Sequence, residues 1–354
     1  MVAKQRDSNI ELYRIIIMIL IVAHHYVVNS GLFELMRQSP TSFKSLYLFL
    51  FGMWGKTGRN CFVLIPGYFM CQSRITLRKF TKLLFWVLFY NIAVYLAFCI
   101  FGYTDFSIGS FITALLPIRI INDDFVSCFL IFFLTIPFLN ILIKNMSKQQ
   151  HLLLLILSLF VYSIWALIPG IVVRFNYVIW FDILYLISSF IRLYGIFDQV
   201  DYKKWGWISL CSVLVSMLSV LAVILSGHPG TAYYFMEINT ILSVVTSVCL
   251  FMFFKNYPLK YHKWINSIGA STFGVLLIHA NSNTMRQWLW KDTFNNVGYY
   301  DKNIYLHSIL SVLLVFFICI MIDQLRLKFI EEPLFKQLDN YMARKKTLFG
   351  FNWT

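Results

Sequence analysis

The first apolar stretch of the chain, 9–31, carries residue types that could do chemistry. Arg14 and His25 stand eleven positions apart in it, together with Glu11 and His24. In an α-helix, Arg14 and His25 then differ by about 20° around the axis and by about 16 Å along it. Glu11 can pair with Arg14 three residues later, whereas His24 points about 100° away from His25. An arginine that can bind an anion and a histidine that can move a proton therefore share one helix face.

Two interpretations of this helix are open. Arg14 could extend to the membrane interface while both histidines bond to neighbouring helices, which is a purely structural role. Polar side chains in a spanning helix otherwise face a protein interior or a watery cavity and mark functional sites. The combination of Arg14, a histidine on its face and a basic end of the bundle favours a route for an anion. We expect both side chains to face one continuous polar cavity, open beside Arg14 and closing near His25.

The composition places this helix in a membrane protein. Hydrophobic residues make up 59% of the 354 residues and charged residues only 13%, which lies outside the range of soluble domains. Windows of about 20 residues, the length that crosses a bilayer, identify about ten apolar segments. They lie at 10–30, 57–73, 80–102, 125–144, 151–169, 177–197, 205–226, 238–254, 266–290 and 304–326. The predicted fold is all-α and polytopic, with about ten transmembrane helices and a short re-entrant or interfacial helix at 45–55.

The distribution of charge predicts the orientation. Lys and Arg gather at the N-terminus, in alternate loops and in the C-terminal tail, so the positive-inside rule places both termini in the cytoplasm. We assign 1–335 to a transmembrane domain and 336–354 to a basic cytoplasmic tail. The stretch 325–346 would continue past the last span as a basic amphipathic helix on the anionic inner leaflet. These segments explain the net charge of +14 without a nucleic-acid partner. The seven scattered cysteines indicate neither a disulfide framework nor a metal site.

Arg14, ten intervening residues and His25 reproduce the R-x10-H signature of the acyltransferase-3 family, which the chain resembles. Later stretches resemble further landmarks of the family in the same order. They are GRNCFVLIPGYFM (58–70), LTIPFLN (134–140), YLISSFIRLYG (185–195), SIGASTFGVLLIH (267–279) and FIEEPLF (329–335). The resemblance thus covers nearly the whole chain.

The sequence departs from the family pattern at three places. Pro66 replaces a serine, Lys79 and Lys82 replace an Arg-x-x-Arg pair, and Asp124-Phe125 replaces an aromatic pair. The lysines keep the positive charge but lose the bidentate geometry that arginine offers a phosphate. These departures bear on the anion contacts more than on the class of reaction.

The resemblance implies a multi-pass O-acyltransferase of the plasma membrane, most simply an O-acetyltransferase. Its donor would be cytoplasmic acetyl-CoA or another acyl-CoA, with no metal, and its acceptor a hydroxyl of a surface or lipid-linked glycan such as a capsule or exopolysaccharide. His25 would act as general base or as a transient acyl carrier. Arg14 would hold the donor and stabilise developing negative charge. The acceptor, the acyl group and the oligomeric state stay open.

Other polar residues are candidates that also have plausible structural roles. Four cations before and within the third segment could hold the phosphates of acyl-CoA, or could serve only as positive-inside anchors. They are Arg74, Arg78, Lys79 and Lys82. Glu11, Arg59, Asn60 and His279 could line the cavity, although interfacial anchoring of Arg59 and Asn60 and a core role for His279 are equally simple. Arg192 and the turn at 331–333 indicate structural pairing near the inner surface.

Two other functions compete with acyl transfer. A polysaccharide polymerase or flippase of glycan assembly would also be a polytopic membrane protein, but the outer loop at 102–124 carries only Arg119 as a cation. A secondary transporter would be expected to show internal repeats and paired broken helices, and the sequence shows neither. Consumption of acetyl-CoA by the protein in detergent separates an acyltransferase from both.

Overall fold

The computed structural model describes residues 7–168, 171 and 173–349, with side chains up to residue 343. Within these residues the chain is helical and contains no strand. The α-helices are α1 (Ser8–Val28), α2 (Leu32–Gln38), α3 (Phe43–Gly52), α4 (Gly55–Met70), α5 (Leu77–Ile100), α6 (Ile108–Leu115), α7 (Phe125–Asn145), α8 (Lys148–Leu159), α9 (Tyr177–Tyr194), α10 (Tyr202–Leu225), α11 (Ile241–Asn256), α12 (Lys263–Ala270), α13 (Thr272–His279), α14 (Asn283–Gln287), α15 (Ile304–Arg326) and α16 (Glu332–Phe349). The all-α fold is therefore confirmed.

Among the described residues, seven helices are long and apolar enough to cross a membrane, or eight if one bent pair counts as a single span. The predicted count of ten is not confirmed. Two of the predicted segments, 57–73 and 238–254, form the 16-residue helices α4 and α11. The short helix predicted at 45–55 is α3, which packs against α1.

The predicted segment 266–290 is not one helix. It divides into α12, α13 and α14, followed by a π-helical turn at Trp288–Thr293. The break before α14 has a local cause, because the Ser282 hydroxyl accepts a hydrogen bond from the Met285 backbone N–H at 3.1 Å and so caps a new helix. A hydropathy window averages over such polar breaks, and the prediction of a single span at 266–290 is therefore wrong.

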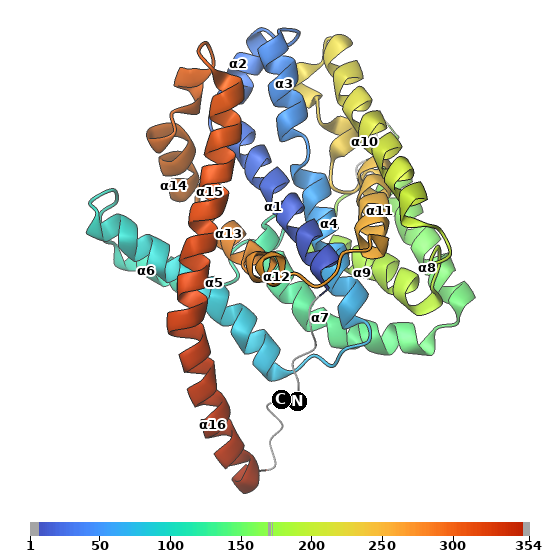
Figure 1. Cartoon of the computed structure of the whole chain (residues 1–354), viewed down its shortest axis with the longest axis vertical. Helices are drawn as coiled ribbons and strands as arrows, with labels where there is room; N and C mark the ends of the chain where they lie inside the picture. Colours follow the sequence, from blue (N-terminus) through green and yellow to red (C-terminus); the bar gives the residue numbers. More distant parts are fainter. Residues whose placement is uncertain (1–6, 169–170, 172, 350–354) are drawn as a thin grey trace.

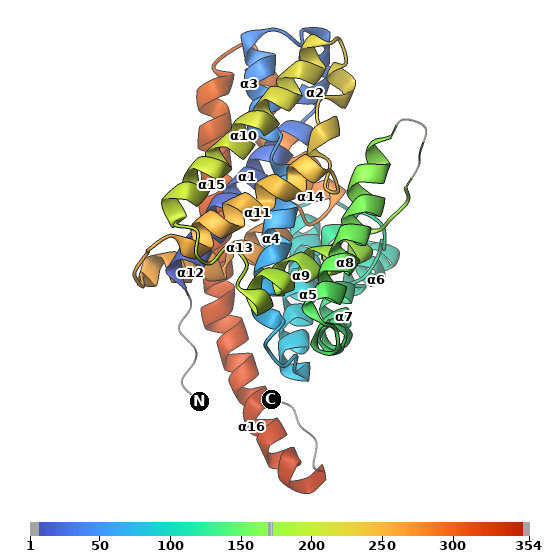
Figure 2. The ribbon, with the colours of Figure 1, turned by 90° about the vertical axis from the view of Figure 1, so that its right-hand side faces the viewer.

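Helix α1 lies inside the bundle (Figures 1 and 2), where it packs against α3, α4, α11, α12, α13 and α15. This position explains its composition, because Glu11, His24 and His25 are buried against other helices and do not face lipid. In Figure 1, α1 and α5 begin, and α4 and α7 end, toward the lower side of the bundle. His25 lies in the last turn of α1, away from this side.

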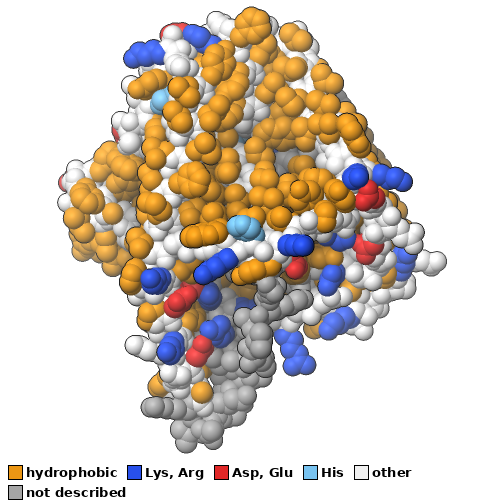
Figure 3. Space-filling view, in the orientation of Figure 1, with side chains coloured by type: hydrophobic (Ala, Val, Ile, Leu, Met, Phe, Trp, Pro, Cys, Tyr) orange, Lys and Arg blue, Asp and Glu red, His pale blue; other side chains and the backbone are white. Residues whose placement is uncertain are grey.

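The outer surface is apolar over most of one face. Figure 3 shows hydrophobic side chains covering the body of the molecule, while most of the Lys, Arg, Asp and Glu side chains gather below them. Exposed residues of α15 such as Leu314 and Phe317 contribute to this surface. Such a surface is what contact with lipid requires.

The C-terminal helix continues the direction of α15. A π-helical turn at Leu327–Glu331 joins α15 to α16, which extends beyond the bundle (Figures 1 and 2). Residues 336–349 of the predicted tail lie in α16, which begins at Glu332. Residues 350–354 of that tail lie outside the described residues.

Candidate active site

Two histidines from distant parts of the chain meet in the protein interior. His25 comes from the last turn of α1 and His279 from the last residue of α13, and both rings are buried. His25 Nδ1 lies 2.9 Å from His279 Nε2. The break of the 266–290 segment positions this pair, because α13 ends at His279 inside the bundle instead of continuing as a straight helix.

The hydrogen bonds of the pair define which nitrogens carry protons when both rings are neutral. His279 Nδ1 lies 2.6 Å from the Val275 carbonyl oxygen. A carbonyl oxygen only accepts, so His279 Nδ1 is protonated and its Nε2 must accept in turn. His25 Nδ1–H donates to that nitrogen. His25 Nε2 is then unprotonated and has the lone pair that a general base needs.

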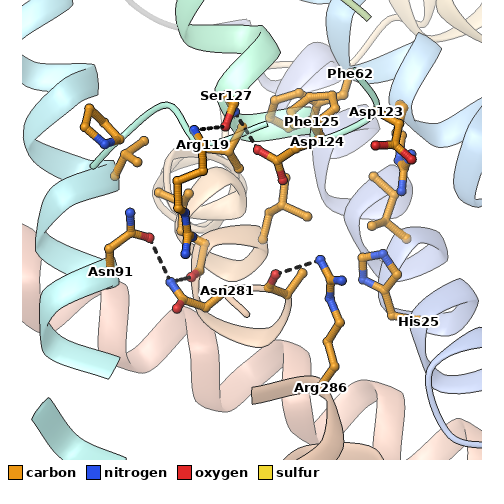
Figure 4. A pocket seen from close by; sticks show the side chains of 18 residues that line it. His25, Phe62, Asn91, Arg119, Asp123, Asp124, Phe125, Ser127, Asn281 and Arg286 are labelled. Atoms are coloured by element: carbon orange, nitrogen blue, oxygen red, sulfur yellow. Dashed lines mark hydrogen bonds between the residues drawn. The ribbon is translucent and has the colours of Figure 1, made fainter. Parts of the chain in front are cut away.

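His25 borders a polar pocket of about 760 Å³, including its mouth (Figure 4). The pocket lies between the C-terminal part of α1, α5, the loop that precedes α7, and the segment from α13 to α14. Its charged and amide-bearing lining residues are Arg59, Asn91, Arg119, Asp123, Asp124, Asn281 and Arg286. Within the described residues, no group of three or more His, Cys, Asp or Glu side chains could hold a metal ion.

Arg286 and His25 lie near each other in this pocket (Figure 4). The Arg286 guanidinium is fixed by donating from Nη1 to Asn283 Oδ1 at 3.1 Å and from Nη2 to the Ala280 carbonyl at 3.2 Å. Its buried Nε–H has no hydrogen-bond partner among the described residues. A positioned cation with an unused donor therefore stands beside the histidine.

The opposite wall comes from the loop before α7. Asp124 caps α7 by accepting a hydrogen bond from the Ser127 N–H at 2.8 Å, and the Asn122 carbonyl accepts one from the Tyr177 N–H at 2.8 Å. The first bond fixes a carboxylate at the edge of the pocket, and the second ties the loop to α9. From the sequence, Asp124 stands out only as a departure from a family pattern.

Arg59 and Asn60, two neighbours predicted to line the cavity, have different surroundings. Arg59 lines the pocket and donates from Nη1 to the Tyr177 hydroxyl at 2.8 Å. Asn60 is fully buried elsewhere, where it donates to the Ile238 carbonyl at 2.7 Å and accepts from Trp180 Nε1 at 2.8 Å. Of these two neighbours, only Arg59 reaches the site.

His24 has a different environment from His25. Its Nδ1 lies 2.5 Å from the Gly52 carbonyl oxygen, so this nitrogen donates to the backbone. Its ring occupies the space beside Gly55, where an added Cβ would lie 2.2 Å from ring atoms. His24 therefore packs α1 against the segment between α3 and α4, on another side of the helix from His279.

Arg14 does not line the pocket of His25 as the described residues define it. Its Nη1 lies 3.5 Å from Glu11 Oε1, the ion pair that the spacing predicts. Between Arg14 and His25, Ile17, Met18 and Ile21 are buried. An added Cβ at Gly58 of α4 would lie 2.9 Å from Ile21, which shows how closely α4 packs there.

The continuous polar cavity expected from Arg14 to His25 is therefore not present in the described structure. Apolar side chains fill the space on the helix face that the two residues share. Their spacing in the sequence places Arg14 and His25 on one face of α1, but spacing alone does not indicate which side chains pack between them.

Three of the four predicted phosphate-binding cations, Arg78, Lys79 and Lys82, use their side chains in contacts within the chain. Arg78 forms a bidentate pair with Asp339 of α16, with both N–O distances 2.7 Å. Lys82 Nζ lies 2.5 Å from Glu331 Oε1, and Lys79 Nζ donates to the Arg74 carbonyl at 2.8 Å. The structure thus gathers these cations at the start of α5 but places carboxylates of the C-terminal segment against two of them.

A buried charged network escaped the sequence analysis. Asp323 and Arg326 at the end of α15 are almost fully buried, and Arg326 Nε donates to Asp323 Oδ1 at 2.9 Å. Tyr90 donates to the same carboxylate oxygen at 2.6 Å, and Arg326 also pairs with Glu331. The pairing expected for the 331–333 turn is made by Glu331, with Arg326 and Lys82. Arg192 instead donates from Nη1 to the Tyr68 hydroxyl at 2.8 Å.

A protein-family model matches nearly the whole chain. The family model described as an acyltransferase domain, that of the acyltransferase-3 family, matches residues 7–323. No curated protein and no solved structure matches the chain. The match includes α1 with Arg14 and His25, the loop before α7 and the helices that bring His279 and Arg286 to the pocket. The chain belongs to the acyltransferase-3 family and is a membrane acyltransferase.

Proposed function

We propose that the protein is an O-acyltransferase that moves an acyl group, most simply acetyl, from cytoplasmic acyl-CoA to a hydroxyl of a surface or lipid-linked glycan. His25 Nε2 is the general base. The observation that supports this role most directly is the hydrogen-bonded series from His25 through His279 to the Val275 carbonyl, which leaves Nε2 as an acceptor on a ring that borders a polar pocket.

The proposed reaction needs two proton transfers, one from the acceptor hydroxyl to His25 and one from His25 to the leaving thiolate. His25 Nε2 takes the proton of the acceptor hydroxyl as its oxygen forms a C–O bond to the thioester carbon. The C–S bond then breaks, and the thiolate of CoA takes the proton from the imidazolium. Negative charge that develops on the carbonyl oxygen would be stabilised by the N–H groups of Arg286 and Arg59, which line the same pocket.

The proposal places the donor at the opposite end of α1. Arg14 would hold the donor, and Arg74, Arg78, Lys79 and Lys82 would contact the phosphates of acyl-CoA after Arg78 and Lys82 exchange their carboxylate partners for phosphate. The side chains of Ile17, Met18 and Ile21 then have to move for the acyl arm to reach His25. This arrangement corresponds to a plasma-membrane protein with both termini in the cytoplasm and the pocket toward the outer face.

Purified protein in detergent tests the proposal. Wild-type protein should consume acetyl-CoA, as measured by release of the free thiol, and His25→Ala should abolish this reaction. NMR of the host's surface glycan, with and without the gene, should show the loss of an O-acyl signal. A folded protein that never consumes acetyl-CoA would point to a flippase or transporter and overturn the proposal.

A further inference from the structure

A second pocket adjoins the pocket of His25. It measures about 730 Å³, including its mouth, and shares Asn91, Arg119 and Asn281 with the first pocket. Asn281 Nδ2 donates to Asn91 Oδ1 at 3.2 Å (Figure 4), and both amides line both pockets. A molecule bound at His25 that extended past these amides would enter the second pocket.

Helix α6 covers the second pocket with its polar side. Ser110, Thr113 and Ala114 line the pocket, with Ala114 buried and Ser110 and Thr113 solvent-exposed at its open side, whereas Ile108 and Ile112 lie on the other side of the helix and are 72% and 52% exposed. The Tyr95 hydroxyl fixes the start of α6 to α5, because it accepts from the Ser107 N–H and donates to the Ser107 carbonyl, both at 2.9 Å. The amphipathic sequence of this eight-residue helix thus places hydroxyl groups over the pocket.

The lining of the second pocket fits a neutral, hydroxyl-rich ligand. Thr104, Ser110, Thr113, Ser282 and Thr284 place hydroxyl groups in its lining. Thr113 Oγ1 donates to the Gly109 carbonyl and Ser282 Oγ accepts from the Met285 N–H, so Thr113 can still accept from a ligand and Ser282 can still donate to one. The aromatic rings of Tyr95 and Phe98 offer apolar surface to the C–H faces of a sugar. Asp105 and Arg119 carry opposite charges, so the pocket has no excess of cations of the kind that a phosphate would require.

We propose that the pocket beneath α6 binds the sugar residue next to the one whose hydroxyl is acylated at His25. The acceptor is then an oligosaccharide of at least two residues, or the end of a longer glycan, and not a small alcohol. This inference rests on the proposed acyltransferase function and adds to it a second acceptor subsite.

Substitutions on the two sides of α6 provide a matched test. Ser110→Trp fills the second pocket, Ser110→Ala leaves it open, and Ile112→Trp places the same bulk on the opposite side of the helix. In the host, a gene that encodes each variant replaces the wild-type gene. NMR then measures the O-acyl content of the surface glycan, and purified protein gives acetyl-CoA hydrolysis without added acceptor, a reaction that needs only the pocket of His25.

Ser110→Trp should lower glycan O-acylation at least about tenfold, which corresponds to about 1.4 kcal/mol of lost acceptor binding. Its acetyl-CoA hydrolysis and melting temperature should stay at the wild-type level, and Ile112→Trp should behave as wild type in every assay. Ser110→Ala, which removes one hydroxyl and leaves the pocket open, should lower glycan O-acylation less than Ser110→Trp does. If Ser110→Trp misfolds, Thr113→Leu fills the same pocket and is read in the same way.

The proposed subsite would be refuted if Ser110→Trp or Thr113→Leu folds normally, fills the second pocket and still gives the wild-type level of glycan O-acylation. Equal loss of hydrolysis and O-acylation would overturn it as well, because the two pockets would then not be separate. Retained O-acylation together with loss of a co-purifying lipid would identify a lipid site instead. Failure of the acyltransferase function itself looks different, since His25→Ala would then leave glycan O-acylation unchanged.

Discussion

Replacement of His279 tests the hydrogen-bonded pair most sharply. His279→Ala removes the acceptor of the His25 Nδ1–H bond and leaves that N–H buried without a partner. An unsatisfied buried donor costs about 1–3 kcal/mol, which corresponds to about 5- to 150-fold in an equilibrium. The proton of His25 can escape this cost by moving to Nε2, the nitrogen that must accept during catalysis. We therefore expect kcat to fall by about 5- to 150-fold, with the KM for acetyl-CoA little changed.

His279→Gln is the conservative control variant for His279→Ala. Glutamine can place its amide oxygen near the position of His279 Nε2 and accept from His25 Nδ1–H. We expect its kcat to lie between those of His279→Ala and wild type. His25→Ala, which removes the base itself, should lose about 100- to 10,000-fold.

Thiol release from acetyl-CoA by purified protein measures all three variants, with the melting temperature in detergent as the control for folding. The reasoning is refuted if folded His279→Ala turns over like wild type while His25→Ala is inactive. It is also refuted if the effect of His279→Ala appears only in KM, because a residue that orients the base should act on kcat.

Three further predictions follow from described contacts. His24→Ala should keep most of the O-acylation activity, because His24 bonds the backbone on another side of α1; equal loss in His24→Ala and His25→Ala would contradict this. The double variant Lys79→Ala/Lys82→Ala should raise the KM for acetyl-CoA, more so at low salt, where the lost attraction is strongest. An unchanged KM would mean that these lysines serve only to orient the protein in the membrane. Asp323→Ala should lower the free energy of unfolding by about 3 kcal/mol or more, since it removes a partner of buried Arg326, and a melting temperature equal to wild type would show that the network is not stabilising.

The helical period was enough to predict the relation between residues on one helix. The spacing of Arg14 and His25, the ion pair of Arg14 with Glu11 and the different direction of His24 all follow from about 100° per residue. His279 was also identified from the sequence as a candidate, although nothing in its apolar surroundings indicated that its ring would meet His25.

The sequence did not reveal how separate elements converge. Arg286 and Asn281 lie within a segment that average hydropathy predicts to be one span, and only its division into three short helices brings them to the pocket. Polar residues in an apolar segment are a signal that could have identified them. Asp323 and Arg326 were missed in the same way, because the rest of α15 is strongly apolar.

The contacts of His279 also limit where a proton can travel. A proton taken up by His25 can be shared with His279 through the bond between the two rings, but beyond His279 stands the carbonyl oxygen of Val275, a backbone group that does not titrate. The pair therefore does not form a proton wire toward the N-terminal end of α1. Whatever proton enters the pair from the pocket has to leave by the same pocket. Acid–base chemistry at His25 is thus confined to the pocket, and each turnover restores the starting protonation state on its own.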